Sequence, residues 1–184
     1  MARVLVPFTT GVEEIEFVAV VDLLRRADVE VCMASLDGHP VTGRSNIVIK
    51  PDAALPDVMH DNWDMVVLPG GLPNAHLLRD DENVKTVVER LRAESKSIAA
   101  ICAAPTALAA YGITAGRRVT SYPAFKDSMK ELQPSSVYVD DAVVEDDFLI
   151  TSRGAGTAVT FALRLIARLC GEAKAEEISV SIVA

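Results

Sequence analysis

The sequence predicts an α/β protein built on a mostly parallel sheet with helices on both of its faces. Short apolar runs alternate with amphipathic helical patterns along the chain, which is the order of elements in β-α-β units. The runs assigned to strands are apolar at nearly every position, as expected when helices cover both faces of a sheet. The first unit, strand Arg3–Phe8 followed by helix Val12–Arg26, shows both features.

The predicted strands are short apolar runs bounded by turn residues, and the second is rich in β-branched residues. In chain order they are Arg3–Phe8, Val29–Leu36, Asn46–Ile49, Asp64–Leu68, Ser97–Ile101, Arg118–Ser121, Val137–Val144 and Phe148–Thr151. Pro69-Gly70-Gly71 ends the fourth strand. The last two runs are expected to form a hairpin that turns at Asp146-Asp147.

The predicted helices place apolar residues three and four positions apart, with charged residues between them. They are Val12–Arg26, Glu82–Glu94, Ala104–Tyr111, Pro123–Leu132, Gly156–Leu169 and Ala173–Ile182. Gly112 is expected to close the third helix, because glycine commonly follows a helix end. Functional residues of such sheets gather at the carboxyl ends of the strands. We therefore expect the site at the loop after Phe8, at Gly70-Gly71 and at Cys102.

Composition and charge limit the class of protein. The 184 residues fit one domain, 1–184, and half of them are hydrophobic, which is ample for a core. The formal net charge of -8 and the lack of a basic run argue against nucleic acid or an anionic membrane as a partner. No apolar run is long enough to span a membrane, and the first residues lack a signal-peptide pattern. Three widely spaced cysteines make no disulfide framework. We expect a cytoplasmic protein with free thiols.

Cys102 is the candidate nucleophile. It ends the apolar strand Ser97–Ile101, and an alanine-rich helix leaves from it at once. The amides at a helix N-terminus stabilise a thiolate because they carry partial positive charge. A free cysteine is more often a small buried hydrophobic residue, and that is the interpretation for Cys32 and Cys170. Cys102 differs from them because it stands at the end of a strand, between small residues.

Gly70 and Gly71 follow the strand Asp64–Leu68 and, taken alone, indicate only a turn. Glycine lets the backbone come close to a ligand and leaves its N–H free. Beside Cys102, an N–H from Gly71 and one from Ala103 are candidates to hold a developing oxyanion.

Glu16 is the candidate acid. Acidic residues in a first helical turn complement the helix dipole, and this accounts for Glu13 and Glu14. Glu16 instead shares the apolar face of its helix with Val20 and Leu23, which should pack on the sheet. A carboxyl there is desolvated and holds its proton toward neutral pH. Next to the Cys102 thiol it should share one proton with it.

Other kinds of site fit the sequence less well. Phe8-Thr9-Thr10-Gly11 resembles a phosphate loop, but the glutamates behind it would repel a phosphate, and no nucleotide-binding glycine motif is present. A cysteine protease needs a histidine near Cys102, and His76 is the one plausible partner; His39 and His60 are expected at the surface. No cluster has the spacing of metal ligands.

Three motifs in the same order resemble the ThiJ/PfpI superfamily, in the branch of the Parkinsonism-associated deglycase and its bacterial YajL relatives. The motifs are Gly11-Val12-Glu13-Glu14-Ile15-Glu16, Leu68-Pro69-Gly70-Gly71 and Ala100-Ile101-Cys102-Ala103-Ala104-Pro105, and the resemblance covers essentially the whole chain. It implies a flavodoxin-like α/β sandwich that forms a homodimer. It also implies that Cys102 is the reactive cysteine and Glu16 its protonated partner, with the Gly71 and Ala103 amides nearby.

The sequence departs from the family at several positions. Ala103 stands where protease-like members have histidine, which argues against proteolysis. Tyr122 stands where some relatives have a histidine near the thiol, and tyrosine is a poor base at pH 7. Gly43 and Lys50 replace extra cysteines of the Parkinsonism-associated relative, and Ala155 replaces a proline there.

The leading hypothesis is an enzyme without metal or cofactor that acts on 2-oxoaldehydes, converting methylglyoxal to lactate, or on early glycation adducts. Its partners would be small reactive carbonyl compounds or glycated protein. The alternative is a non-catalytic oxidative-stress sensor or redox-regulated chaperone, in which an accessible, low-pKa Cys102 thiolate stops at sulfinic acid.

Overall fold

A computed structural model describes residues 1–184. Its main sheet has seven strands in the order β10-β11-β7-β6-β1-β2-β5, and every neighbouring pair except β10–β11 is parallel. These strands are β1 (Arg3–Phe8), β2 (Glu30–Ser35), β5 (Ala53–Ala54), β6 (Met65–Leu68), β7 (Ser97–Ile101), β10 (Val143–Asp146) and β11 (Leu149–Ser152). The predicted fold class is confirmed.

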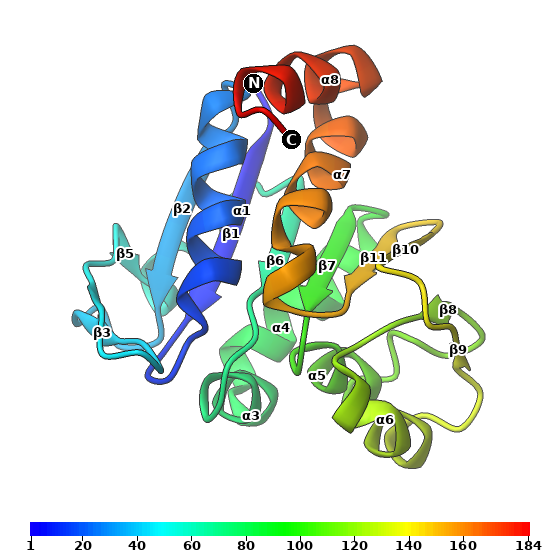
Figure 1. The fold of residues 1–184 in the computed structure, drawn as a ribbon. Coiled ribbons are helices and arrows are strands. Elements are labelled where there is room, and N and C mark those ends of the chain that lie inside the picture. The colour runs from blue at the N-terminus through cyan, green and yellow to red at the C-terminus, as the bar shows by residue number, and fades with distance from the viewer.

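Helices cover both faces of the sheet. The helices of the whole chain are α1 (Glu14–Arg26), α2 (Leu55–Val58), α3 (Asn74–Asp80), α4 (Glu82–Ala93), α5 (Pro105–Ala110), α6 (Lys126–Leu132), α7 (Ala158–Cys170) and α8 (Glu172–Ser181). Helices α1 and α7 lie side by side on one face, and α4 lies on the other (Figure 1). Along β1 the side chains alternate between the two cores: Val4 and Val6 pack toward α1 and α7, and Leu5 packs on the opposite side.

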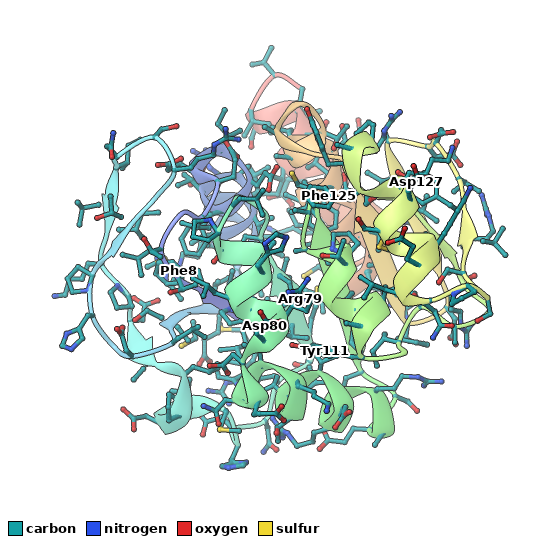
Figure 2. All side chains as sticks on the ribbon, turned by 90° about the horizontal axis from the view of Figure 1, so that it is seen from below. Phe8, Arg79, Asp80, Tyr111, Phe125 and Asp127 are labelled. Atoms are coloured by element: carbon teal, nitrogen blue, oxygen red, sulfur yellow. The ribbon has the colours of Figure 1, made fainter.

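The carboxyl ends of the parallel strands meet at one end of the molecule. Helices α3, α5 and α6 lie at this end, below the arrowheads in Figure 1. Figure 2 looks at it from below, with Phe8 at the end of β1 and Phe125 just before α6 both labelled. The Tyr111 hydroxyl, also labelled, donates to the carbonyls of Leu78 and Arg79 at 2.8 and 2.9 Å, which ties α5 to α3. This end of the sheet is therefore held by helix-to-helix contacts.

Two strand predictions were wrong in part. The run Val137–Val144 is not one strand: β9 (Val137–Tyr138) pairs with β8 (Arg118–Val119) in a small sheet, and the hairpin joins β10 to β11 with its turn at Asp147-Phe148. The expected strand Asn46–Ile49 is reduced to β4 (Val48–Ile49), paired with an unpredicted β3 (Val41–Thr42). Short helices α2 and α3 were also not predicted. No helix is both long and apolar enough to cross a bilayer.

Candidate active site

Cys102 lies on the tight connection between β7 and α5. Its φ is +65°, in the left-handed region that a side chain other than glycine enters only at a cost of about 1 kcal/mol. The neighbouring segments hold the backbone there. The Cys102 N–H donates to the carbonyl of Ser152 at 3.0 Å, and the Cys102 carbonyl accepts from the N–H of Tyr122 at 2.8 Å. The half-buried thiol is thus fixed at the carboxyl end of the sheet.

Glu16 on α1 is completely buried and faces the same point. Its Oε2 accepts a hydrogen bond from the Gly70 N–H at 2.9 Å. Its Oε1 is buried, and the Cys102 thiol is the one group that offers it a hydrogen bond. A Cβ placed on Gly154 would lie 3.9 Å from this Oε1 and 4.0 Å from the Cys102 Sγ, so the two atoms approach one spot from different elements. The structure therefore brings the predicted acid and the predicted nucleophile together.

Glu16 and Cys102 change each other's proton affinity. Burial is the largest cause that raises the pKa of Glu16 to about 7. Burial, the charge of Glu16 and the hydrogen bond between the two side chains together raise the pKa of Cys102 to about 12. Two adjacent anions repel, so the pair shares one proton once its first proton is lost. The redox-sensor hypothesis expects a low pKa for the Cys102 thiol. This expectation is wrong, because burial and the charge of ionised Glu16 raise that pKa.

Three backbone amides line the space around these side chains. Hydrogen bonds from the Gly71 and Ala103 N–H groups lower the pKa of Cys102, the direction expected for donors that stabilise negative charge at the sulfur. The Gly70 N–H is taken up by Glu16. A Cβ on Gly70 would overlap both the Glu16 carboxylate and the Cys102 Cβ, so only glycine allows the acid this close to the thiol.

A pocket of about 320 Å³ opens onto the thiol, a size that suits a small molecule. Five of its lining residues were predicted for the site: Glu16, Gly71, Cys102, Ala103 and Tyr122. The others, not predicted for it, are Glu13, Arg44, Leu72, Phe125 and Ala155. Tyr122 lies at the rim and is exposed.

Glu13 is the N-cap residue of α1. Its side chain caps α1 by accepting from the Glu16 N–H at 2.8 Å. The sequence signal for it was present but indicated only a helix start, so its place in the pocket was missed. The local sequence around Arg44 gives no indication that it belongs to the pocket. Its loop is held at α1 by contacts with residues that are distant in the sequence.

No histidine lines the pocket. His76 lies on α3, where its ring meets the ring of Phe125 edge to face at a centroid distance of 6.4 Å. The other two cysteines do not approach the site. Cys32 is half-buried on β2, and Cys170 is exposed at the end of α7, contrary to the prediction that it is buried. No group of three or more His, Cys, Asp or Glu side chains is placed to hold a metal ion.

Comparisons with known proteins show similarity to one family over most of the chain. The model of the DJ-1/PfpI family matches residues 2–168. Protein dj-1beta of Drosophila melanogaster is 41% identical over 97% of this chain and 95% of its own length. The glutathione-independent glyoxalase DJR-1.2 of Caenorhabditis elegans is 40% identical over 88% of this chain and 85% of its own length. The crystal structure of Drosophila melanogaster DJ-1beta superposes with a TM-score of 0.95 at 39% identity, covering 100% of this chain and 98% of that one.

Proposed function

The chain belongs to the DJ-1/PfpI family, and on that premise we propose that it is a cysteine enzyme of the glyoxalase or deglycase type. The proposed substrates are 2-oxoaldehydes such as methylglyoxal, or early glycation adducts on protein, and no cofactor is required. The observation that carries the proposal is the buried Oε1 of Glu16 facing the Cys102 thiol in a small pocket. A relative named a glutathione-independent glyoxalase supports the choice of reaction.

The first step forms a hemithioacetal. The Glu16 carboxylate first takes the proton of the Cys102 thiol. The resulting thiolate attacks the aldehyde carbon, a C–S bond forms, and the carbonyl electron pair moves to oxygen. The Gly71 and Ala103 N–H groups stabilise the oxyanion. The oxyanion then takes the proton that Glu16 holds, which leaves Glu16 as a carboxylate base.

The second step is an internal oxidation and reduction. Glu16 removes the proton from C1 and returns it to C2, while the hydroxyl proton passes from the C1 oxygen to the C2 oxygen. C1 becomes a thioester and C2 an alcohol, so no external oxidant is needed. Water then attacks the thioester, the C–S bond breaks, and a 2-hydroxy acid and the thiolate are released.

The direct test is to incubate the purified protein with methylglyoxal, without glutathione, and to follow lactate by NMR. We expect lactate to accumulate over many turnovers, well above the rate with heat-denatured protein. If methylglyoxal is consumed only to the extent of one adduct per thiol and no lactate forms, the proposed function is wrong.

We propose that the protein also forms a homodimer, through apolar side chains exposed on α1 and on the hairpin beside it. These side chains are Ile15, Val18, Ile47 and Val48. The amides of Ser45 and Ile47 bind the Glu14 carboxylate, so the hairpin that carries Ile47 and Val48 lies against the start of the helix that carries Ile15 and Val18. Exposed apolar surface of this kind is typical of a protein interface.

Replacing Val18 by aspartate is expected to halve the mass measured by light scattering, because the charge would be buried in the interface. Val137→Asp is the matched control. Both valines are 52% exposed, but Val137 lies on β9, away from the proposed interface. A wild-type protein with the mass of one chain would contradict the proposal.

A further inference from the structure

Arg44 lines the pocket that contains Cys102, its charge acts on Glu16, and its side chain is available to a ligand. Arg44 stands in the loop between β3 and β4 and is exposed. It makes no hydrogen bond, ion pair or ring contact with its side chain. Every other arginine of the chain makes at least one such contact. An anion can therefore bind Arg44 without displacing an internal partner.

Hydrogen bonds to residues at the start of α1 hold the backbone of Arg44 and its loop in place. Its own N–H donates to the Val12 carbonyl at 3.0 Å, just before α1. The next residue, Ser45, donates its N–H at 2.8 Å to the Oε1 of Glu14, whose carboxylate is buried. A Cβ on Gly43 would overlap that carboxylate, so the loop closes tightly around it. Glu14, which the proposed reaction does not use, thus fixes the Arg44 backbone relative to the helix that carries Glu16.

Two charged residues of the pocket lining change the pKa of Glu16. The charge of Glu13 raises the pKa of Glu16, and the charge of Arg44 lowers it. Glu13 is buried and engaged in capping α1, whereas Arg44 is exposed at the opening. A neutral carbonyl compound gains no ion pair from Arg44. A carbonyl compound with a negatively charged group gains one while its aldehyde carbon lies at the thiol.

We infer that Arg44 is a specificity-determining residue that selects reactive carbonyl compounds carrying a carboxylate or a phosphate. The substrate class rests on the proposed function. The preference of the pocket for anions does not, since any reagent that reacts with Cys102 senses the same charge.

Alkylation of Cys102 tests this preference without turnover. Iodoacetate and iodoacetamide share a leaving group and differ in charge, so the ratio of their rates cancels changes in thiolate content. For Arg44→Gln we expect the iodoacetate-to-iodoacetamide ratio to fall about fivefold, the effect of an exposed ion pair. Arg44→Lys should restore most of it. Arg153→Gln, which removes an equal charge from the rim of the neighbouring pocket, should leave the ratio unchanged.

An unchanged ratio in Arg44→Gln, or an equal fall in Arg153→Gln, would overturn the inference. Turnover gives the second measurement, with neutral methylglyoxal, carboxylate-bearing 4,5-dioxopentanoate and phosphate-bearing hydroxypyruvaldehyde phosphate. In Arg44→Gln, kcat/KM for at least one anionic substrate should fall about fivefold relative to methylglyoxal, through KM. Equal losses on all three would overturn the inference. If the wild type turns over none of them, the proposed function fails and the alkylation ratio still decides the role of Arg44.

Discussion

Replacing Cys102 by serine is expected to lower the rate of lactate formation from methylglyoxal at least a thousandfold. A serine hydroxyl is a much weaker acid and a much weaker nucleophile than a thiol, so the Glu16 carboxylate, with a pKa of about 7, cannot ionise it to a useful extent. Loss of a catalytic nucleophile commonly costs on the order of a thousandfold or more. NMR detection of lactate measures the rates of both proteins under the same conditions.

Cys32→Ser and Cys170→Ser are the controls for this prediction. Neither thiol lines the pocket, and Cys170 is the most exposed of the three. Both variants should turn over methylglyoxal at the wild-type rate. Lactate formation that survives Cys102→Ser, or that falls equally in all three variants, would place the reaction outside the pocket.

Glu16→Gln is expected to reduce activity and to increase stability. The amide cannot carry a proton between two carbon atoms, and loss of such a group commonly costs about a hundredfold to ten-thousandfold in rate. The amide can still accept from the Gly70 N–H, as the carboxylate does. It also removes a buried charge that has only partial compensation. The rate and the free energy of unfolding should therefore change in opposite directions.

The gain in stability depends on pH in a defined direction. Burial raises the pKa of Glu16 from 4.5 in the unfolded chain to about 7 in the folded protein. The folded state therefore binds the proton more tightly, and this stabilisation is present below pH 4.5 and lost as the pH rises through about 7. At pH 8 the wild type should lack about 3 kcal/mol that the glutamine variant keeps, and at pH 5 less than about 1 kcal/mol.

Urea denaturation at pH 5 and pH 8 measures this difference. Glu131→Gln is the control, because Glu131 is exposed on α6 and its replacement should have the same small effect at both pH values. If Glu16→Gln is no more stable relative to wild type at pH 8 than at pH 5, then Glu16 does not retain a raised pKa in the folded protein.

The parts of the fold that were predicted are those that local sequence determines. β1 and β7 have the predicted bounds, because each is a buried run that ends at a turn. Val137–Val144 was read as one strand because it is rich in valine. Val137-Tyr138 instead pairs with Arg118-Val119, and nothing in the local pattern reveals that partner.

The same distinction applies to the candidate site. Gly70-Gly71 and Cys102 follow strand ends, and because such ends lie at one edge of a parallel sheet, the sequence was enough to group these residues in one site. Glu16 was found because it is an acid on an apolar helix face. Arg44 was missed because a hydrogen bond from its neighbour to Glu14, 31 positions away, sets its place. Its loop carries no pattern that indicates this contact.

The two hydrogen bonds that hold the Cys102 main chain bear on how far a chemical change at the sulfur can be felt. One runs to the last residue of β11 and the other comes from the segment before α6. An adduct on Sγ forms on a main chain that is already tied to both. A signalling protein needs such an event to move something that a partner can read. A displacement of the Cys102 main chain would require at least one of these two hydrogen bonds to break. A covalent bond to Sγ, in contrast, can form and break repeatedly while both hydrogen bonds stay in place.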